Sequence, residues 1–407
     1  MLAPVPTRSA ARPKAAEFFA GIGLVRLGLE RAGFAVPWSN DIESDKQQMY
    51  VNHFRDPASA HRYALGDVAD VTGDDLPADL TLAWASFPCT DLSLAGWRRG
   101  LAGRESSTFW HFTRLMDELG DARPSVVALE NVTGLATSHG GADLVAAIAE
   151  LNRLGYSADV LTLDARRFVP QSRPRLFVVG AREPGLLPPV GVATDTALRP
   201  DWLAKVFADP SLRTHRAALP APPPLRTTGL TGLAEEIPST DERWWDAART
   251  EAFVASLSPI QAARLTELRA GSRVVCRTAY RRTRKGAATW EIRADDVAGC
   301  LRTARGGSSK QAVVRAGRGE VRVRWMTSVE YARLMGAGEY RLDGLRPNQA
   351  LFGFGDAVCV PAVAWLAEHY LMPLVHGHAG QVAERPAWGG GAPADPGAAG
   401  ITVAAGA

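Results

Sequence analysis

A thiol and a carboxyl group each follow an apolar segment of this sequence. Pro88-Cys89 comes after the apolar run 80–86, and Glu130 comes directly after the apolar run 126–129. If both runs are strands of one α/β sheet, their carboxyl ends open onto the same crevice. Cys89 and Glu130 would then face one substrate from neighbouring strands.

This pairing suits the addition of a nucleophile across the 5,6 double bond of a pyrimidine. A thiolate that adds to C6 of cytosine converts the ring into an enamine, which can take a methyl group at C5. An acid near N3 and a cation near O2 would stabilise the negative charge that develops. Glu130 can supply the acid, and Arg173 and Arg175, on one side of a strand by two-residue periodicity, can supply the cation. The set predicts a methyltransferase that acts on cytosine.

Each of these residues also has an ordinary structural explanation. A cysteine after a strand is most often a small buried apolar residue. Glu130 could be a helix-cap partner of Thr133, and Arg173 and Arg175 could form an exposed edge. The occurrence of the whole set, in this order and at strand ends, favours the catalytic interpretation.

A glycine-containing loop, residues 18–28, joins the first predicted strand to the first predicted helix. Gly21 and Gly23 would let the backbone turn sharply and approach a ligand closely. Asp41 follows the second strand, where a carboxylate can bind both hydroxyls of an adenosine ribose. Asp67 could accept a hydrogen bond from an adenine amino group, or it could be a plain turn residue. These features fit NAD, FAD and S-adenosylmethionine alike.

The elements that must position these residues occupy the first half of the chain. Strand and helix signals alternate over 14–180, which predicts a doubly wound, mostly parallel, Rossmann-like α/β domain for catalysis and cofactor binding. Prolines interrupt 181–296, which we expect to form a second, smaller and irregular domain. Residues 297–378 include an amphipathic helix that would return to the first domain. A flexible segment, 1–13, and a disordered tail, 379–407, complete the prediction.

The bulk composition is typical of a globular protein. The 407 residues are 46% hydrophobic and 22% charged, with a net charge of +3. We expect no signal peptide, no apolar run long enough to cross a bilayer, and no membrane partner. Four cysteines without a CxxC pair favour a reducing cytoplasm over a disulfide framework, and they predict no metal site. The three cysteines other than Cys89 are assigned to packing: Cys276, Cys300 and Cys359.

Taken together, these motifs resemble those of the DNA (cytosine-5) methyltransferase family. The resemblance extends from Glu17 to about Leu374, apart from the middle segment. The matching segments, in the family's order, are Phe19-Ala-Gly21-Ile-Gly23, Ser39-Asn-Asp41-Ile42, Pro88-Cys89 to Gly96, Glu130-Asn131-Val132, Gln171-x-Arg173-x-Arg175, Arg324 to Gly336 and Gly355-Asp356-Ala357-Val358. So many motifs in one order make the resemblance specific.

The resemblance implies a mechanism and a cofactor. It implies S-adenosylmethionine as the methyl donor and a cytosine flipped out of double-stranded DNA into the pocket. Cys89 would be the nucleophile and Glu130 the acid at N3, while Arg175 would contact O2 and Arg173 would orient Glu130. Ile42 would lie against the adenine face. The expected cofactor contacts are Phe19, Gly21, Gly23, Asp41, Ile42, Asp67, Val68, Pro88, Asp356 and Val358.

The middle segment would then recognise the target. Its arginines, interleaved with Tyr280 and Trp290, would contact phosphates and read guanine in the major groove. The expected DNA-binding residues are Ser93, Arg277, Arg281, Arg282 and Arg284. Enzymes of this family usually label host DNA beside a restriction endonuclease or as part of anti-phage defence, although this chain contains no nuclease motif.

The family pattern differs at four single positions, and its Asp-x-Arg pattern is blurred around Gly103 to Trp110, where no contact is carried over. Thr90 stands where the family often has Gln, and Leu92 where Phe is common. Leu24 replaces a frequent third glycine, and Asp356 stands where Asn is usual. These departures keep the thiol, the acid and the two arginines, but they could alter loop closure or cofactor affinity.

Three other functions compete with this interpretation. An RNA (tRNA) cytosine-5 methyltransferase could use the same catalytic motifs, although the sizeable middle segment favours duplex DNA. A NAD-dependent oxidoreductase could use the glycine loop and Asp41, but it would leave Pro88-Cys89 and Glu130 without a purpose. A DNA-binding regulator that has lost catalysis is disfavoured by the intact Cys89, Glu130 and arginine pair.

Overall fold

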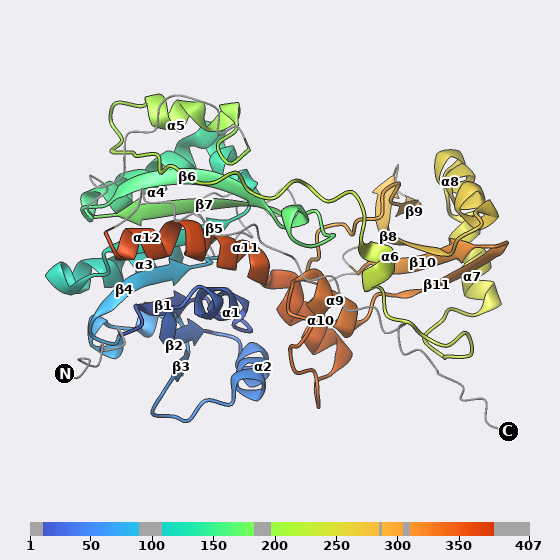
Figure 1. The fold of residues 1–407 in the computed structure, drawn as a ribbon, viewed down its shortest axis with the longest axis horizontal. Coiled ribbons are helices and arrows are strands. Elements are labelled where there is room, and N and C mark those ends of the chain that lie inside the picture. The colour runs from blue at the N-terminus through green and yellow to red at the C-terminus, as the bar shows by residue number, and fades with distance from the viewer. Residues whose placement is uncertain (1–10, 89–107, 183–196, 285–286, 304–309, 378–407) are drawn as a thin grey trace, which may run out of the picture.

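A seven-stranded sheet is built from the first half of the chain (Figure 1). The computed structural model describes residues 11–88, 108–182, 197–284, 287–303 and 310–377. The strand order is β3-β2-β1-β4-β5-β7-β6. The strands are β1 (Lys14–Phe18), β2 (Ala35–Asp41), β3 (Arg62–Leu65), β4 (Leu80–Ala85), β5 (Val126–Asn131), β6 (Ser157–Asp164) and β7 (Pro174–Ala181).

The sheet is mostly parallel, as the alternation of strand and helix signals predicted. All neighbours from β3 to β5 run parallel, whereas β7 is antiparallel to both β5 and β6. The chain order reverses between β1 and β4, and in such sheets the crevice at that point is where ligands bind. The glycine loop follows β1 and Pro88 follows β4, so both reach this crevice.

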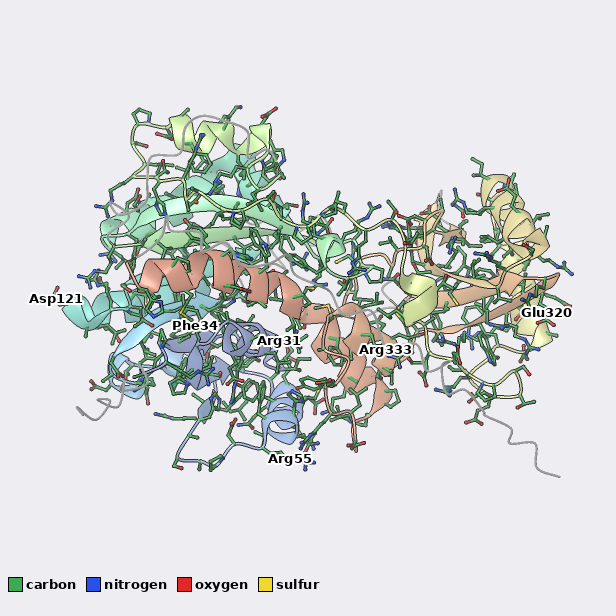
Figure 2. The ribbon with its side chains drawn as sticks, in the orientation of Figure 1. Arg31, Phe34, Arg55, Asp121, Glu320 and Arg333 are labelled. Atoms are coloured by element: carbon green, nitrogen blue, oxygen red, sulfur yellow. The ribbon has the colours of Figure 1, made fainter. Side chains whose placement is uncertain are left out.

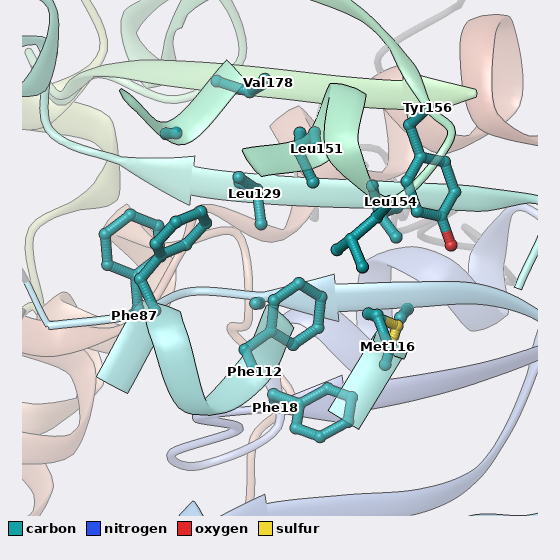
Figure 3. Close-up of a cluster of buried hydrophobic side chains, with 14 of the residues drawn as sticks. Phe18, Phe87, Phe112, Met116, Leu129, Leu151, Leu154, Tyr156 and Val178 are labelled. Atoms are coloured by element: carbon teal, nitrogen blue, oxygen red, sulfur yellow. The ribbon is translucent and has the colours of Figure 1, made fainter. Parts of the chain in front are cut away.

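Helices cover both faces of the sheet, which explains why its strands are apolar along their whole length. One face packs against α3 (Thr108–Glu118) and α4 (Ala142–Arg153). Figure 3 shows this layer, in which Phe112 of α3 packs against Phe18 of β1. The other face packs against α1 (Leu24–Arg31) and α11 (Val360–Leu366).

The contact between α1 and α11 depends on a glycine. A Cβ atom placed on Gly28 would lie 2.6 Å from Cβ of Val363. Real Cβ atoms do not approach so closely, and the absence of a side chain at Gly28 therefore lets the two helices touch. This contact brings the last helices of the chain back to the first one.

A second sheet is antiparallel, with the order β11-β10-β8-β9. Its strands are β8 (Val275–Arg284), β9 (Ala287–Ile292), β10 (Ala312–Gly317) and β11 (Glu320–Trp325). Phe253 of α7 (Ala247–Ala255) and Leu265 of α8 (Pro259–Ala270) pack against one face. Glu320 of this sheet and Asp121, after α3, lie at opposite ends of the molecule (Figure 2).

The proline-rich segment 181–296 is shared between the two sheets. Residues 197–219 lie on the first sheet, where Thr162 donates to the carbonyl of Leu198 and Arg199 pairs with Asp159. In the other direction, β10 and β11 lie beyond residue 296 yet complete the second sheet. The boundary expected at 296 therefore falls between strands of one sheet. Proline content marked irregular backbone, but it carried no information about strand pairing.

Three further helices lie between the sheets and beside them: α6 (Leu230–Leu233), α9 (Ser328–Leu334) and α10 (Pro347–Asp356). Figure 1 shows α9 and α10 between the two sheets. Ile22 of the glycine loop, Val313 of β10 and Phe354 of α10 belong to one apolar cluster. The described residues also form the α-helices α2 (Ser44–Phe54), α5 (Ala204–Ala208) and α12 (Met372–Val375).

One helical run corrects the expectation that no segment could cross a bilayer. The run Pro347–Val375 is long enough and has a mean hydropathy of 1.7 in its most apolar window. However, 78% of that window is buried inside the protein. Its apolar character is explained by packing against α1 and the first sheet, because a core helix needs the same composition as a membrane-spanning one.

Candidate active site

The carboxyl ends of β4 and β5 are joined by a side-chain hydrogen bond. Asn131, which follows Glu130, donates from Nδ2 to the carbonyl oxygen of Phe87 at 3.1 Å. The parallel register places Ala85 opposite Leu129, so both strands end at the same level. Pro88 is half-buried directly after Phe87. Cys89 and Ser93, the predicted nucleophile and phosphate contact, lie outside the described residues.

Glu130 forms its ion pair with Arg175. Arg175 Nε lies 2.9 Å from Glu130 Oε1, and the two side chains are 14% and 8% exposed. Arg175 is on β7, which runs antiparallel to β5 and carries Phe177 opposite Glu130. A nearly buried carboxylate that is paired with a guanidinium group is fixed in position. This suits a group that must contact one particular atom of a substrate ring.

The structure corrects the role expected for Arg173. Arg173 is buried, and its guanidinium group donates to the carbonyl oxygens of Leu301 at 2.7 Å, Gly355 at 3.1 Å and Ala357 at 2.6 Å. Burial, together with the nearby charge of Arg175, lowers its pKa. Arg173 thus ties two distant segments together, and it is Arg175 that holds Glu130.

Gln171 likewise binds backbone groups of distant segments. Its Nε2 donates to the carbonyl oxygen of Leu334 at 2.7 Å, and its Oε1 accepts from the backbone amide of Leu301 at 3.1 Å. The Gln-x-Arg-x-Arg segment therefore has a buried structural half, Gln171 and Arg173, and a site-facing half, Arg175. Sequence reasoning missed this division because the deciding partners lie more than 120 residues further along the chain.

The glycine loop after β1 has an unusual backbone. Phe19, Gly21 and Gly23 all have positive φ values, of 57°, 57° and 80°. For Phe19 this conformation is strained, and such strain is concentrated at functional sites. Tyr63 of β3 donates to the carbonyl oxygen of Gly21 at 3.0 Å, which holds the loop in place.

The two glycines of the loop have different roles. A Cβ on Gly23 would lie 2.5 Å from the ring of Phe54, so Gly23 is required for packing against α2. A Cβ on Gly21 would meet only the side chain of Lys46, at an ordinary 3.8 Å. Gly21 therefore keeps open space beside it into which a ligand can come.

Asp41 lies against this loop at the end of β2. One carboxylate oxygen accepts from the amide of Gly21 at 2.8 Å, and the other accepts from the amide of Glu43 at 2.9 Å. Burial raises the pKa of Asp41, while Lys46 and the two amides act against that shift. Next to it, Ile42 is 63% exposed, which is unusual for a large apolar residue. A carboxylate beside an open apolar side chain fits a ribose and an adenine ring.

The other predicted cofactor residues are less open. Asp67 is exposed, but its carboxylate accepts from the amide of Ala69 at 2.9 Å, which is the turn role considered as its alternative. Val68 and Val358 are buried in apolar clusters. Asp356 is paired with Lys46 at 3.1 Å and accepts a hydrogen bond from Thr303. Lys46 had not been predicted, because nothing in the local sequence marks a lysine of α2 as part of this site.

The predicted DNA-binding arginines differ in their surroundings. Arg277 pairs with Asp296 at 3.0 Å and is 15% exposed, so its charge is already used within the protein. Arg282 is half-exposed, with its guanidinium group 4.8 Å from the centre of the Tyr280 ring and 3.9 Å from Glu291. Arg281 is exposed on β8. Nothing is described of the side chain of Arg284.

Comparison with known protein families matches most of the chain to one of them. Residues 14–371 match the family described as C-5 cytosine-specific DNA methylase. The chain is 30% identical to the type II methyltransferase M.Bsp6I of Bacillus sp. (strain RFL6) over 171 residues, which cover 41% of this chain and 51% of that relative. It is 29% identical to the type II methyltransferase M.HhaI of Haemophilus parahaemolyticus over 164 residues, which cover 40% and 47%. The chain spans about half the length of these relatives.

Solved structures show the same fold. The Dnmt2 methyltransferase of S. pombe has a TM-score of 0.55 at 15% identity, and the match covers 89% of this chain and 99% of that one. A putative DNA modification methyltransferase encoded within an E. coli prophage has a TM-score of 0.52 at 14% identity, covering 88% and 97%. At these identities the likeness concerns the arrangement of the elements.

Proposed function

Because the chain belongs to the C-5 cytosine-specific DNA methylase family, we propose that it transfers a methyl group from S-adenosylmethionine to C5 of a cytosine in duplex DNA. The observation that carries this proposal is the ion pair between Arg175 and Glu130 at the end of β5, next to the strand end that leads to Cys89. An acid and a cation at this place meet the electrostatic needs of a thiol addition to a pyrimidine.

The chemical roles follow from that arrangement. The thiolate of Cys89 forms a bond to C6, and the electrons of the 5,6 double bond are displaced toward N3, which takes a proton from Glu130 in its protonated form. Arg175 holds Glu130 and brings positive charge to the side where O2 would lie. After C5 has taken the methyl group, a base removes the C5 proton, N3 returns its proton to Glu130, Cys89 leaves as the thiolate, and the ring regains its double bond. Arg173 would not contact the reacting atoms, and its role would be to hold the backbone segments that it binds.

The residues around the glycine loop fit the cofactor. Asp41 would bind the ribose hydroxyls, Ile42 would lie against adenine, and the space beside Gly21 would admit the amino-acid end. Phe19, Gly23, Asp67, Val68, Pro88, Asp356 and Val358 complete the set of expected contacts. When bound, S-adenosylmethionine would supply a methyl group from its positively charged sulfonium, with the neutral thioether as the leaving group.

The second sheet would form the target-recognition part, and we propose limits of about 220–326 for it. Arg281 and Arg282, on β8, would contact the DNA backbone or a guanine. The exposure of Arg281 supports this, whereas Arg277 serves the protein's own packing. Relatives named as type II methyltransferases support a role beside a cognate restriction endonuclease.

Methylation mapping tests this function directly. Plasmid from cells that express the wild-type protein should carry methylated cytosine at one recurring sequence, as read by bisulfite conversion. Plasmid from cells that express Cys89→Ser should carry none, although the purified variant should still bind S-adenosylhomocysteine. Purified wild-type protein that labels tRNA but no duplex DNA would overturn the proposed substrate, and wild-type activity of Cys89→Ser would remove Cys89 from the mechanism.

A further inference from the structure

We propose that Lys46 binds the carboxylate of the methionyl part of S-adenosylmethionine, while its partner Asp356 faces the amino group. The inference rests on the proposed function, since it concerns the same cofactor. An α-amino acid carries one positive and one negative group on adjacent atoms. A lysine and an aspartate that lie side by side present the complementary pair of charges.

The position of Lys46 favours such a contact. Its side chain passes beside Gly21, where a Cβ on the glycine would lie 3.8 Å from Cδ of the lysine. Its Nζ lies 3.1 Å from Oδ2 of Asp356 and 3.2 Å from Oε1 of Glu43. The ammonium group is thus placed where the glycine loop, the start of α2 and the end of α10 meet.

The charge of Lys46 is secured by its surroundings. The side chain is only 13% exposed. Burial alone would lower its pKa, but Asp41, Asp356 and Glu43 raise it, and the net shift is upward. Lys46 therefore keeps its positive charge beside the glycine loop, as the binding of a carboxylate requires.

The carboxylate of Asp356 is held in position by contacts with both of its oxygens. Thr303 donates to Oδ1 while Lys46 approaches Oδ2. The neighbouring backbone is equally constrained, because a Cβ on Gly355 would lie 2.6 Å from the backbone nitrogen of Thr303. An acidic residue where the family usually has Asn brings an additional negative charge, and Lys46 balances it. The two residues therefore form one unit of the pocket.

Two ligands separate a contact with the cofactor from a merely structural role. S-adenosylhomocysteine carries the carboxylate and the amino group, whereas 5′-methylthioadenosine shares the adenosine and the thioether but lacks both. Lys46→Met keeps the apolar part of the side chain beside Gly21. By calorimetric titration, this variant should bind S-adenosylhomocysteine at least about 10-fold more weakly than wild type, because a charge-assisted hydrogen bond is lost. Its affinity for 5′-methylthioadenosine should stay within about 2-fold of wild type.

A matched control removes an exposed ion pair of α2. Arg346, directly before α10, pairs with Asp45 of α2 at 2.8 Å, and the two side chains are 71% and 57% exposed. Arg346→Met should leave the affinity for both ligands unchanged. Lys46→Gln, which keeps a hydrogen-bond donor without the charge, should show the same selective loss and serves if Lys46→Met unfolds.

The outcomes are distinct. Equal weakening for both ligands would show that Lys46 only shapes the loop, and unchanged affinity for both would show that it does not take part; either result overturns the inference. A wild-type protein that binds neither ligand would instead refute the cofactor of the proposed function. Selective loss for S-adenosylhomocysteine supports the contact.

Discussion

Arg175 Nε lies 2.9 Å from Oε1 of Glu130, across the antiparallel pair of β7 and β5. Two residues earlier, Arg173 donates to carbonyl oxygens of residues 301, 355 and 357. The two arginines of this short motif thus have different roles. One fixes the candidate acid, and the other joins the segment before β10 and the end of α10 to the first sheet.

This division predicts different consequences for two similar substitutions. Arg175→Ala should lower kcat for methyl transfer by at least about 10-fold, because Glu130 and the developing charge lose their cation. Its free energy of unfolding should also fall, because the nearly buried Glu130 carboxylate loses its counter-charge. Arg173→Ala should lower the free energy of unfolding by about 2 kcal/mol or more, since several buried carbonyl groups lose their donor, but it should leave kcat much less affected than Arg175→Ala does. Urea unfolding and single-turnover kinetics on both variants test this, and exchanged phenotypes would contradict the assignment.

The arginines of β8 should differ in DNA binding. Replacing Arg281 and Arg282 together with Ala should weaken binding to duplex DNA and reduce the slope of log K against log salt concentration by about 0.9 for each lost phosphate contact. Arg277→Ala should leave that slope unchanged and reduce stability, because it breaks the pair with Asp296. Fluorescence anisotropy at several salt concentrations measures the slope. The same slope in the double variant and the wild type would exclude this part of β8 from the interface.

A buried carboxyl group behind the glycine loop should make stability depend on pH. Burial raises the pKa of Glu17 from its ordinary 4.5 to about 8, although Arg26 acts in the opposite direction. The folded state then binds the proton more tightly than the unfolded state. Its stability is therefore present at low pH and is lost as the pH rises from about 4.5 to about 8.

Glu17→Gln should remove this dependence, since the amide does not ionise. The difference in unfolding free energy between the variant and the wild type should grow from about pH 5 to about pH 8 and level off above that. Denaturant titration at several pH values measures this difference. Differences from all other titrating groups cancel in the comparison. A gain that does not vary with pH would show that Glu17 has the same pKa in both states.

The helix contact at Gly28 can be tested with a matched glycine. Gly28→Ala would place a Cβ 2.6 Å from Val363, and the crowding between α1 and α11 should cost about 1–3 kcal/mol. Gly232, in the short helix α6, has no atom within 4 Å of such a Cβ, so Gly232→Ala should be neutral or slightly stabilising. Thermal unfolding of both variants measures the difference. Equal Tm values would show that the helices separate without cost.

The order of elements and the placement of the candidate acid could be predicted from local patterns. A buried strand needs a short apolar run, and a parallel sheet brings the ends of such runs to one edge. This is why 126–129 followed by Glu130 was informative. The glycine loop and Asp41 were recognisable for the same reason, since tight turns and strand ends have local signatures. Ile42 beside them is exposed, which leaves its side chain accessible for the predicted contact with adenine.

Other features were decided only when distant segments came together. Arg173 and Arg175 are alike in sequence, and the carbonyl groups that bind Arg173 lie more than 120 residues away. Lys46 became part of the candidate site through its ion pair with Asp356. Strand β10 became part of the second sheet through its pairing with β8. The helices of the apolar run 347–375 became part of the core because other elements cover them. Local patterns determine which segments form strands, helices and turns. The partner of a buried charge depends on contacts between distant segments, and a short stretch of sequence carries no information about those contacts.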